Sequence, residues 1–142
     1  MPDEAAGSSR QRVPELPPDL DAFLRQPRPA VIATVRADGR PSTAAIWYLW
    51  EAGHVMLSMS PDGARARNLR RNPGLAITVL GQEWPPAHVS LIGSVVEFRD
   101  DADFQFADRL SVHFTGKPFG HRGLSPCLVV ARIDRWHTAR FA

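Results

Sequence analysis

Residues 30–60 read AVIATVRADGRPSTAAIWYLWEAGHVMLSMS, and their pattern is the strongest indication of the fold. Its first segment places Val31, Ala33 and Val35 on one side, an alternation typical of a β-strand. The pair Asp38-Gly39 is a strong hairpin-turn signal, and Gly53 marks a second turn. The stretch therefore predicts a meander of three consecutive antiparallel strands, at residues 30–36, 41–50 and 54–60.

The rest of the chain has further β-strand patterns and predicts three more strands, at residues 75–81, 88–100 and 127–136. Gly93 inside the longest of these suggests a β-bulge or a sharp bend. Apolar residues at helical spacing predict helices over residues 17–26 and 100–114, the second with acidic residues at its positive end. Six strands with two or three short helices predict a mainly β protein, a small closed or nearly closed antiparallel barrel.

The composition is that of an ordinary globular protein of one domain. The 142 residues carry a formal net charge of +2, which is too small to indicate a nucleic-acid-binding protein. Residues 1–17 are rich in Pro, Ser, Gly and charge and read as a disordered tail, so the folded domain is expected over 18–142. The N-terminus does not resemble a signal peptide and no apolar run approaches membrane-spanning length, so we expect a cytoplasmic protein.

Several kinds of site are absent from the sequence. There is no Gly-rich dinucleotide fingerprint, phosphate-binding loop, zinc-binding helix motif or nucleophile elbow. The five histidines are scattered without metal-ligand spacing, so no metal site is predicted. Cys127 is the only cysteine, and its apolar neighbours favour a buried, inert thiol.

The segment SPDGARARNLRRNPG, residues 60–74, raises the functional question, because it holds four arginines, at positions 65, 67, 70 and 71. It predicts about two turns of helix, capped by Ser60 or Asp62, with Ala66 and Leu69 docked on the barrel. The arginines could form a solvated helix face, a nucleic-acid contact or a pocket for an anionic small molecule. The start of a helix offers free N–H groups and partial positive charge, so with serines from the preceding strand end it would suit phosphate.

Two motifs carry a family resemblance that covers roughly residues 20–135. The segment ARARNLRRNP, residues 64–73, lies between two strands, and DRLSVHFTGKPF, residues 108–119, precedes the last strand. In this respect the chain resembles the pyridoxamine 5′-phosphate oxidase-like split β-barrels. It is most similar to the actinobacterial flavin/deazaflavin oxidoreductases of the B group, which use coenzyme F420. The family reads close to A-K-x-R-N-L-R-R-D-P, so Arg65 stands where the family has lysine.

The resemblance implies a six-stranded antiparallel split β-barrel and a homodimer with two cofactor sites at the subunit interface. The cofactor's phosphate and side chain would lie at the end of the third strand and the start of the Arg-rich helix, and its ring near Trp47. Trp84 would approach from a loop of the same or the partner subunit. The candidate cofactor-binding residues are Trp47, Ser58, Met59, Ser60, Arg65, Arg67, Asn68 and Trp84.

The function that the resemblance implies is transfer of a hydride from reduced coenzyme F420 to a small organic acceptor. The alternatives are an FMN-dependent oxidase or reductase on the same fold, and a non-catalytic cofactor carrier. The phosphodiester and carboxylate tail of F420 would meet several arginines, whereas FMN has a single phosphate, so the arginines favour F420. No catalytic residue is predicted, because the cofactor carries out the chemistry. Tyr48 and His88 are candidate proton donors only if they face the pocket. The substrate is left open.

Overall fold

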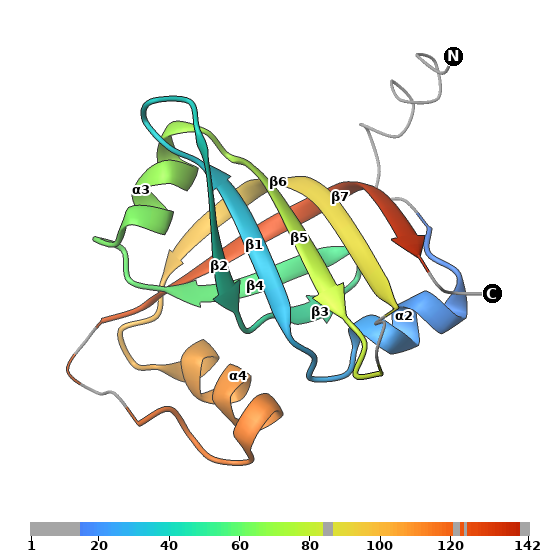
Figure 1. The fold of residues 1–142 in the computed structure, drawn as a ribbon. Coiled ribbons are helices and arrows are strands. Elements are labelled where there is room, and N and C mark those ends of the chain that lie inside the picture. Colours follow the sequence, from blue (N-terminus) through green and yellow to red (C-terminus); the bar gives the residue numbers. More distant parts are fainter. Residues whose placement is uncertain (1–14, 84–86, 121–122, 124, 140–142) are drawn as a thin grey trace.

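The computed structural model describes residues 15–83, 87–120, 123 and 125–139. In this part of the chain one seven-stranded sheet is flanked by three helices (Figure 1). The strands are β1 Ala30–Val35, β2 Pro41–Ile46, β3 Leu49–Glu51, β4 His54–Met59, β5 Gly74–Leu80, β6 His88–Asp100 and β7 Cys127–Ala139. The helices are α2 Pro18–Leu24, α3 Ala64–Arg71 and α4 Gln105–Thr115.

The sheet is antiparallel throughout, in the order β2-β1-β5-β6-β7-β4-β3. Its two edge strands, β2 and β3, are consecutive in the chain and are joined only by Trp47 and Tyr48. The sheet therefore has to curve until its edges meet, which gives the barrel seen in Figure 1. The mainly β, antiparallel split-barrel class predicted from the sequence is confirmed.

The strand count differs from the prediction of six, because the strand predicted over 41–50 is divided in two. Tyr48 lies at the division, is fully buried, and its hydroxyl donates to the carbonyl oxygens of Leu24 (2.9 Å) and Gln26 (3.1 Å). The two halves consequently pair with different partners, β2 with β1 and β3 with β4. The predicted meander is thus two hairpins at opposite edges of the sheet.

The core fills the barrel and is closed at one end by α2 (Figure 1). Strand β1 turns Ala30, Ile32 and Thr34 inward, the set opposite to the one that the sequence analysis singled out. The bulge predicted at Gly93 is confirmed by a register shift between β6 and β7. A Cβ atom at Gly93 would lie 2.0 Å from the carbonyl oxygen of Arg132, so only glycine permits this close approach.

Helices α3 and α4 flank the end of β4 (Figure 1). The buried side chains of Ala66 and Leu69 dock α3 onto the barrel, as predicted. This end of β4 contains Ser58 and Met59 and leads into Ser60, and the sequence analysis placed part of the candidate site there. Within the described residues no helix has the length and hydropathy needed to cross a membrane.

Candidate functional site

Two adjoining cavities open where β4, α3 and α4 come together. The larger, which we call the apolar cavity, has a volume of about 540 Å³. The smaller, which we call the polar cavity, has a volume of about 310 Å³. Met59, Ser60 and Arg65 line both cavities, so the two are parts of one continuous site.

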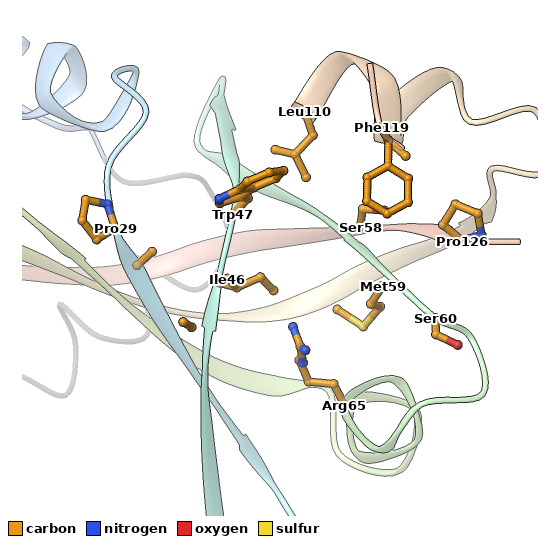
Figure 2. A pocket seen from close by; sticks show the side chains of 13 residues that line it. Pro29, Ile46, Trp47, Ser58, Met59, Ser60, Arg65, Leu110, Phe119 and Pro126 are labelled. Carbon is orange, nitrogen blue, oxygen red and sulfur yellow. The ribbon is translucent and has the colours of Figure 1, made fainter. Parts of the chain in front are cut away.

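The apolar cavity is walled mainly by hydrophobic side chains, which come from β1, β2, β4, α4 and the segments beside them (Figure 2). Besides the three shared residues it is lined by Pro29, Ala30, Ala45, Ile46, Trp47, Ser58, Ala107, Leu110, Phe119 and Pro126. Trp47 is 40% exposed, and its ring stacks on Phe114 of α4 with a centroid distance of 5.1 Å and an interplanar angle of 11°. A planar aromatic surface thus stands at this cavity with one neighbour fixing its orientation.

Phe119 reaches the apolar cavity because the loop after α4 is tied back to that helix. The backbone amide of Phe119 donates a 3.0 Å hydrogen bond to a carboxylate oxygen of Asp108. Its ring stacks on Phe104 at a centroid distance of 6.2 Å. These contacts place Phe119 opposite the end of β4 (Figure 2).

The polar cavity surrounds the start of α3. Hydroxyl groups from β1, β2 and the end of β4 line it, and α3 contributes Gly63 at its N-cap and the two residues that follow. Besides the shared residues it is lined by Ile32, Thr34, Ser42, Thr43, Ala44, Gly63, Ala64 and Asn68. Gly63 provides no side-chain cap, so neither Ser60 nor Asp62 caps the helix as predicted. The carbonyl oxygen of Ser60 instead accepts a hydrogen bond from the Gly63 amide (3.1 Å). No described residue accepts one from the backbone N–H groups of Ala64 and Arg65, and both residues line the polar cavity.

Arg65 is the basic residue of the site. Its side chain extends from α3 toward Ile46 and Met59 (Figure 2). Among the described residues no carboxylate forms an ion pair with it. A cation and a helix N-terminus therefore act on the same space, and both attract an anion.

The other three arginines of the segment bond to the protein itself. Arg67 donates to the carbonyl oxygen of Asp62, and Arg70 to that of Pro61 at 2.7 Å, so both hold the turn that precedes α3. Arg71 donates to the side-chain oxygen of Asn68 at 3.4 Å. The arginine cluster thus divides into one residue at the cavities and three that support the structure around them.

The structure brings together six of the eight residues singled out in the sequence. Five of these line the apolar cavity, namely Trp47, Ser58, Met59, Ser60 and Arg65, and the sixth, Asn68, lines the polar one. Arg67 is exposed and lines neither cavity. Trp84 lies outside the described residues.

Sequence reasoning missed the contributions of β2 and α4. Ser42 and Thr43 lie on a strand whose side chains are largely exposed. The alternation of a strand does not indicate which of its hydroxyl groups line a cavity with a helix that comes later in the chain. Ala107 and Leu110 share the apolar face of α4 that the sequence did show. That face divides its residues between the core and the cavity, and periodicity does not separate the two.

Neither proton donor considered in the sequence faces the site. Burial raises the pKa of Tyr48, whose hydroxyl donates to the carbonyl oxygens of Leu24 and Gln26. His88 begins β6, where its ring lies 6.3 Å from that of His137. Burial lowers the pKa of His113, with a further contribution from Arg109, and this residue also lies outside both cavities.

Cys127 is buried, as predicted, and burial is the largest cause of the rise in the pKa of its thiol. The protonated thiol that this favours is a poor nucleophile. Among the described residues no group of His, Cys, Asp or Glu is arranged to hold a metal ion.

A family model described as Pyridoxamine 5'-phosphate oxidase matches residues 16–139. No curated protein sequence matches the chain. A solved structure named F420 Reductase is 22% identical, covers 86% of this chain and 98% of its own, and superposes with a TM-score of 0.79. A conserved hypothetical protein from Mycobacterium tuberculosis is 20% identical over 89% of this chain and 85% of its own, with a TM-score of 0.70. General Stress Protein 26 from Bacillus anthracis is 14% identical over 82% and 88%, with a TM-score of 0.64. At these identities the superpositions establish the shared fold.

Proposed function

Because the chain belongs to the pyridoxamine 5′-phosphate oxidase family, we propose that it is an oxidoreductase that transfers a hydride from reduced coenzyme F420 to a small organic acceptor. One observation carries the proposal: an apolar and a polar cavity adjoin at Arg65. A cofactor with a flat apolar ring and an anionic chain would fill both. The side chains of each cavity fit the corresponding part.

The polar cavity fits the anionic part of such a cofactor. The uncapped start of α3 offers backbone N–H donors, and Arg65 adds a cation. The hydroxyl groups of Ser42, Thr43 and Ser60 add further donors. Phosphate oxygens accept hydrogen bonds from all three kinds of group.

The apolar cavity fits the ring. Trp47 would provide a stacking surface, and Leu110 and Phe119 would cover the ring and exclude water. The bound deazaflavin supplies the hydride, while the chain orients the ring and shields it. The space left beside the ring would receive the acceptor.

The proposed reaction requires no catalytic acid from the protein. Arg65 is the only Asp, Glu, His, Cys, Tyr, Lys or Arg among the described residues that line the cavities. An arginine does not release its proton in proteins. We therefore propose that the acceptor takes its proton from water.

The preference for F420 over FMN rests on the resemblance of residues 64–73 to the deazaflavin-using group and on the named reductase of the same fold. FMN is the second candidate. A polar cavity of about 310 Å³ with a single arginine is suited to one phosphate group, which FMN also carries. A non-catalytic cofactor carrier would have the same site.

Titration of the purified protein with F420 and with FMN tests these alternatives. We expect saturable binding of F420 by calorimetry and oxidation of reduced F420 in the presence of enone or nitro acceptors. Tight binding of FMN alone would select the second candidate. Binding of F420 with no turnover across a broad acceptor panel would indicate a carrier.

The proposed assembly is a homodimer with the sites at the interface. Large apolar side chains are exposed on β6 (Ile92, Val96), on α4 (Val112) and at the cavity (Trp47), and a second subunit would cover such residues. Trp84 is proposed to contact the cofactor in that assembly, whereas Arg67 keeps its bond to the Asp62 carbonyl group and does not. Light scattering that returned a stable monomer at micromolar concentration would contradict this arrangement.

A further inference from the structure

Two buried polar side chains form part of the wall of the polar cavity. Asn68 is 8% exposed and Thr34 is 3% exposed. The side-chain nitrogen of Asn68 donates to the hydroxyl oxygen of Thr34 at 3.1 Å, and Arg71 donates to the side-chain oxygen of Asn68 at 3.4 Å. Arg71 itself is exposed and lines neither cavity. A chain of hydrogen bonds therefore runs from the surface to the cavity wall.

The direction of this chain follows from the chemistry of its first member. A guanidinium group has only donors, so the atom of Asn68 that faces Arg71 has to be the oxygen. The amino group of Asn68 then faces Thr34, and the Thr34 hydroxyl has to accept. No hydrogen bond among the described residues has the Thr34 hydroxyl as its donor, so the hydrogen of that hydroxyl remains free to donate.

We propose that Arg71 is a positioning residue, which fixes the amide of Asn68 so that the Thr34 hydroxyl donates to an anion in the polar cavity. This inference rests on the proposed function, which places the phosphate of the cofactor there. Without Arg71 the amide can turn over, and Thr34 then donates to the Asn68 oxygen instead. The cavity loses one donor although no residue in its wall has changed.

The arrangement also predicts what the site selects. An oxygen that only accepts hydrogen bonds, such as a phosphate or phosphodiester oxygen, is matched by Thr34 as a donor. An ammonium group at the same point has only donors and cannot accept the Thr34 hydrogen. Arg71 thus contributes to recognition of the anion through Asn68 rather than by contact.

The test is a double-mutant cycle in cofactor affinity, measured by calorimetry with F420 and with FMN. Arg71→Ala and Thr34→Val should each weaken binding by about tenfold, the value of one hydrogen bond to a charged group. The double variant should bind like either single variant, because the two changes remove the same donor. Thr34→Ser should keep the wild-type affinity, and thermal unfolding checks that each variant is folded.

A matched control removes the same charge elsewhere. Arg135 is exposed on β7 and lies outside both cavities, so Arg135→Ala should leave the affinity unchanged. The Arg71→Ala effect should also persist at high salt, since screening weakens long-range attraction more than an effect carried by hydrogen bonds. Losses that multiply in the double variant, or an affinity in Arg71→Ala equal to wild type, would overturn the inference while the proposed function stands.

Inorganic phosphate separates the inference from the proposed function. Its addition should shift the side-chain amide resonance of Asn68 in the wild-type protein and shift it less in Arg71→Ala. If neither cofactor binds but phosphate gives this result, the positioning role stands and the proposed function fails. If phosphate moves the resonance equally in both proteins, the positioning role is wrong. If neither a cofactor nor phosphate binds, both proposals are overturned.

Discussion

The starts of α3 and α4 face the same physical problem and meet it in opposite ways. At α4 the carboxylate of Asp101, which is only 5% exposed, accepts hydrogen bonds from the amides of Phe106 (3.0 Å) and Ala107 (2.9 Å). At α3 the N-cap is Gly63, which has no side chain to offer. One helix start is satisfied by the protein and the other is left open to a cavity.

The backbone amides at the start of α4 contribute to stability, whereas those at the start of α3 remain available for binding. A buried carboxylate at a helix start neutralises the partial positive charge of the amides and completes the fold. An arginine in the first turn of α3 adds positive charge at a place where acids are favoured. That arrangement is unfavourable for the isolated helix, and it becomes favourable once an anion binds.

The largest effect is expected from removing the cap of α4. Asp101→Ala leaves two buried amides without an acceptor, so the free energy of unfolding should fall by about 3 kcal/mol. Asp101→Asn retains one acceptor and should lose about half of that. Urea unfolding measures both, and cofactor affinity well below the unfolding transition should change by less than about threefold. A stability equal to wild type in Asp101→Ala would contradict the assigned cap.

At α3 the corresponding change should act on binding rather than on stability. Arg65→Ala removes a charge-assisted contact to phosphate of about 1.5–3 kcal/mol, so cofactor affinity should fall roughly 10- to 150-fold. Its melting temperature should stay close to wild type, because no described carboxylate pairs with Arg65. Calorimetry and thermal unfolding on the same sample separate the two quantities.

Arg67→Ala is the matched control for Arg65→Ala. It removes the same charge two residues along α3, from a side chain that bonds to the Asp62 carbonyl group outside both cavities. We expect its effect on affinity to be below about threefold. A larger loss in Arg67→Ala than in Arg65→Ala would reverse the assignment of the two arginines.

The fold and much of the site were accessible from the sequence because both depend on local signals. Alternation, the Asp38-Gly39 turn and the bulge at Gly93 each act within a few residues. The start of α3 was recognisable because a strand, a turn and a basic helix follow one another directly. The placement of Ser58, Ser60 and Arg65 at the cavities follows from that continuity.

The remaining features depend on contacts between distant residues. The division of the predicted strand at Trp47 and Tyr48 follows from a bond between Tyr48 and α2, 24 residues earlier. The sequence predicted acidic residues at the start of α4. It did not predict that Asp101 is buried there. The bonds of Arg67 and Arg70 to the preceding turn were hidden as well, because the sequence gives their charge and not their partners.

A carboxylate introduced at α3 tests whether the open start is the reason for binding. Gly63 has φ −76° and ψ 164°, which any residue adopts, and an added Cβ atom would meet only Ser60, at 3.4 Å and beyond. Gly63→Asp should therefore cap the helix and raise stability by a few tenths of a kcal/mol. It should weaken cofactor binding by about tenfold or more, because the new charge occupies the amides and repels phosphate.

Gly63→Asn is the control for charge in that experiment. Its amide oxygen can cap the same N–H groups without a negative charge, so its affinity should lie between those of Gly63→Asp and the wild-type protein. Calorimetry and thermal unfolding give both quantities. If Gly63→Asp binds F420 or FMN as the wild-type protein does, the anion does not lie at the start of α3.

The smallest effect concerns α2, whose first turn carries a carboxylate that is only partly covered. The pKa of Asp21 is lowered first by the hydrogen bond that its carboxylate accepts from Arg25 and then by the one that it accepts from the Trp50 indole N–H. Because the pKa is lower in the folded state, the stabilisation is present above the unfolded pKa of about 3.9 and is lost as the pH falls through the folded value. The carboxylate is exposed to screening by solvent, so we expect it to contribute less than about 1 kcal/mol to the free energy of unfolding.

Urea unfolding between pH 7 and pH 2.5 measures this contribution. The difference in stability between the wild-type protein and Asp21→Asn should shrink as the pH falls. Trp50→Phe removes one hydrogen-bond donor to Asp21 and should reduce this pH dependence. A difference that stays constant over this range would show that the Asp21 carboxylate does not anchor α2 through its charge.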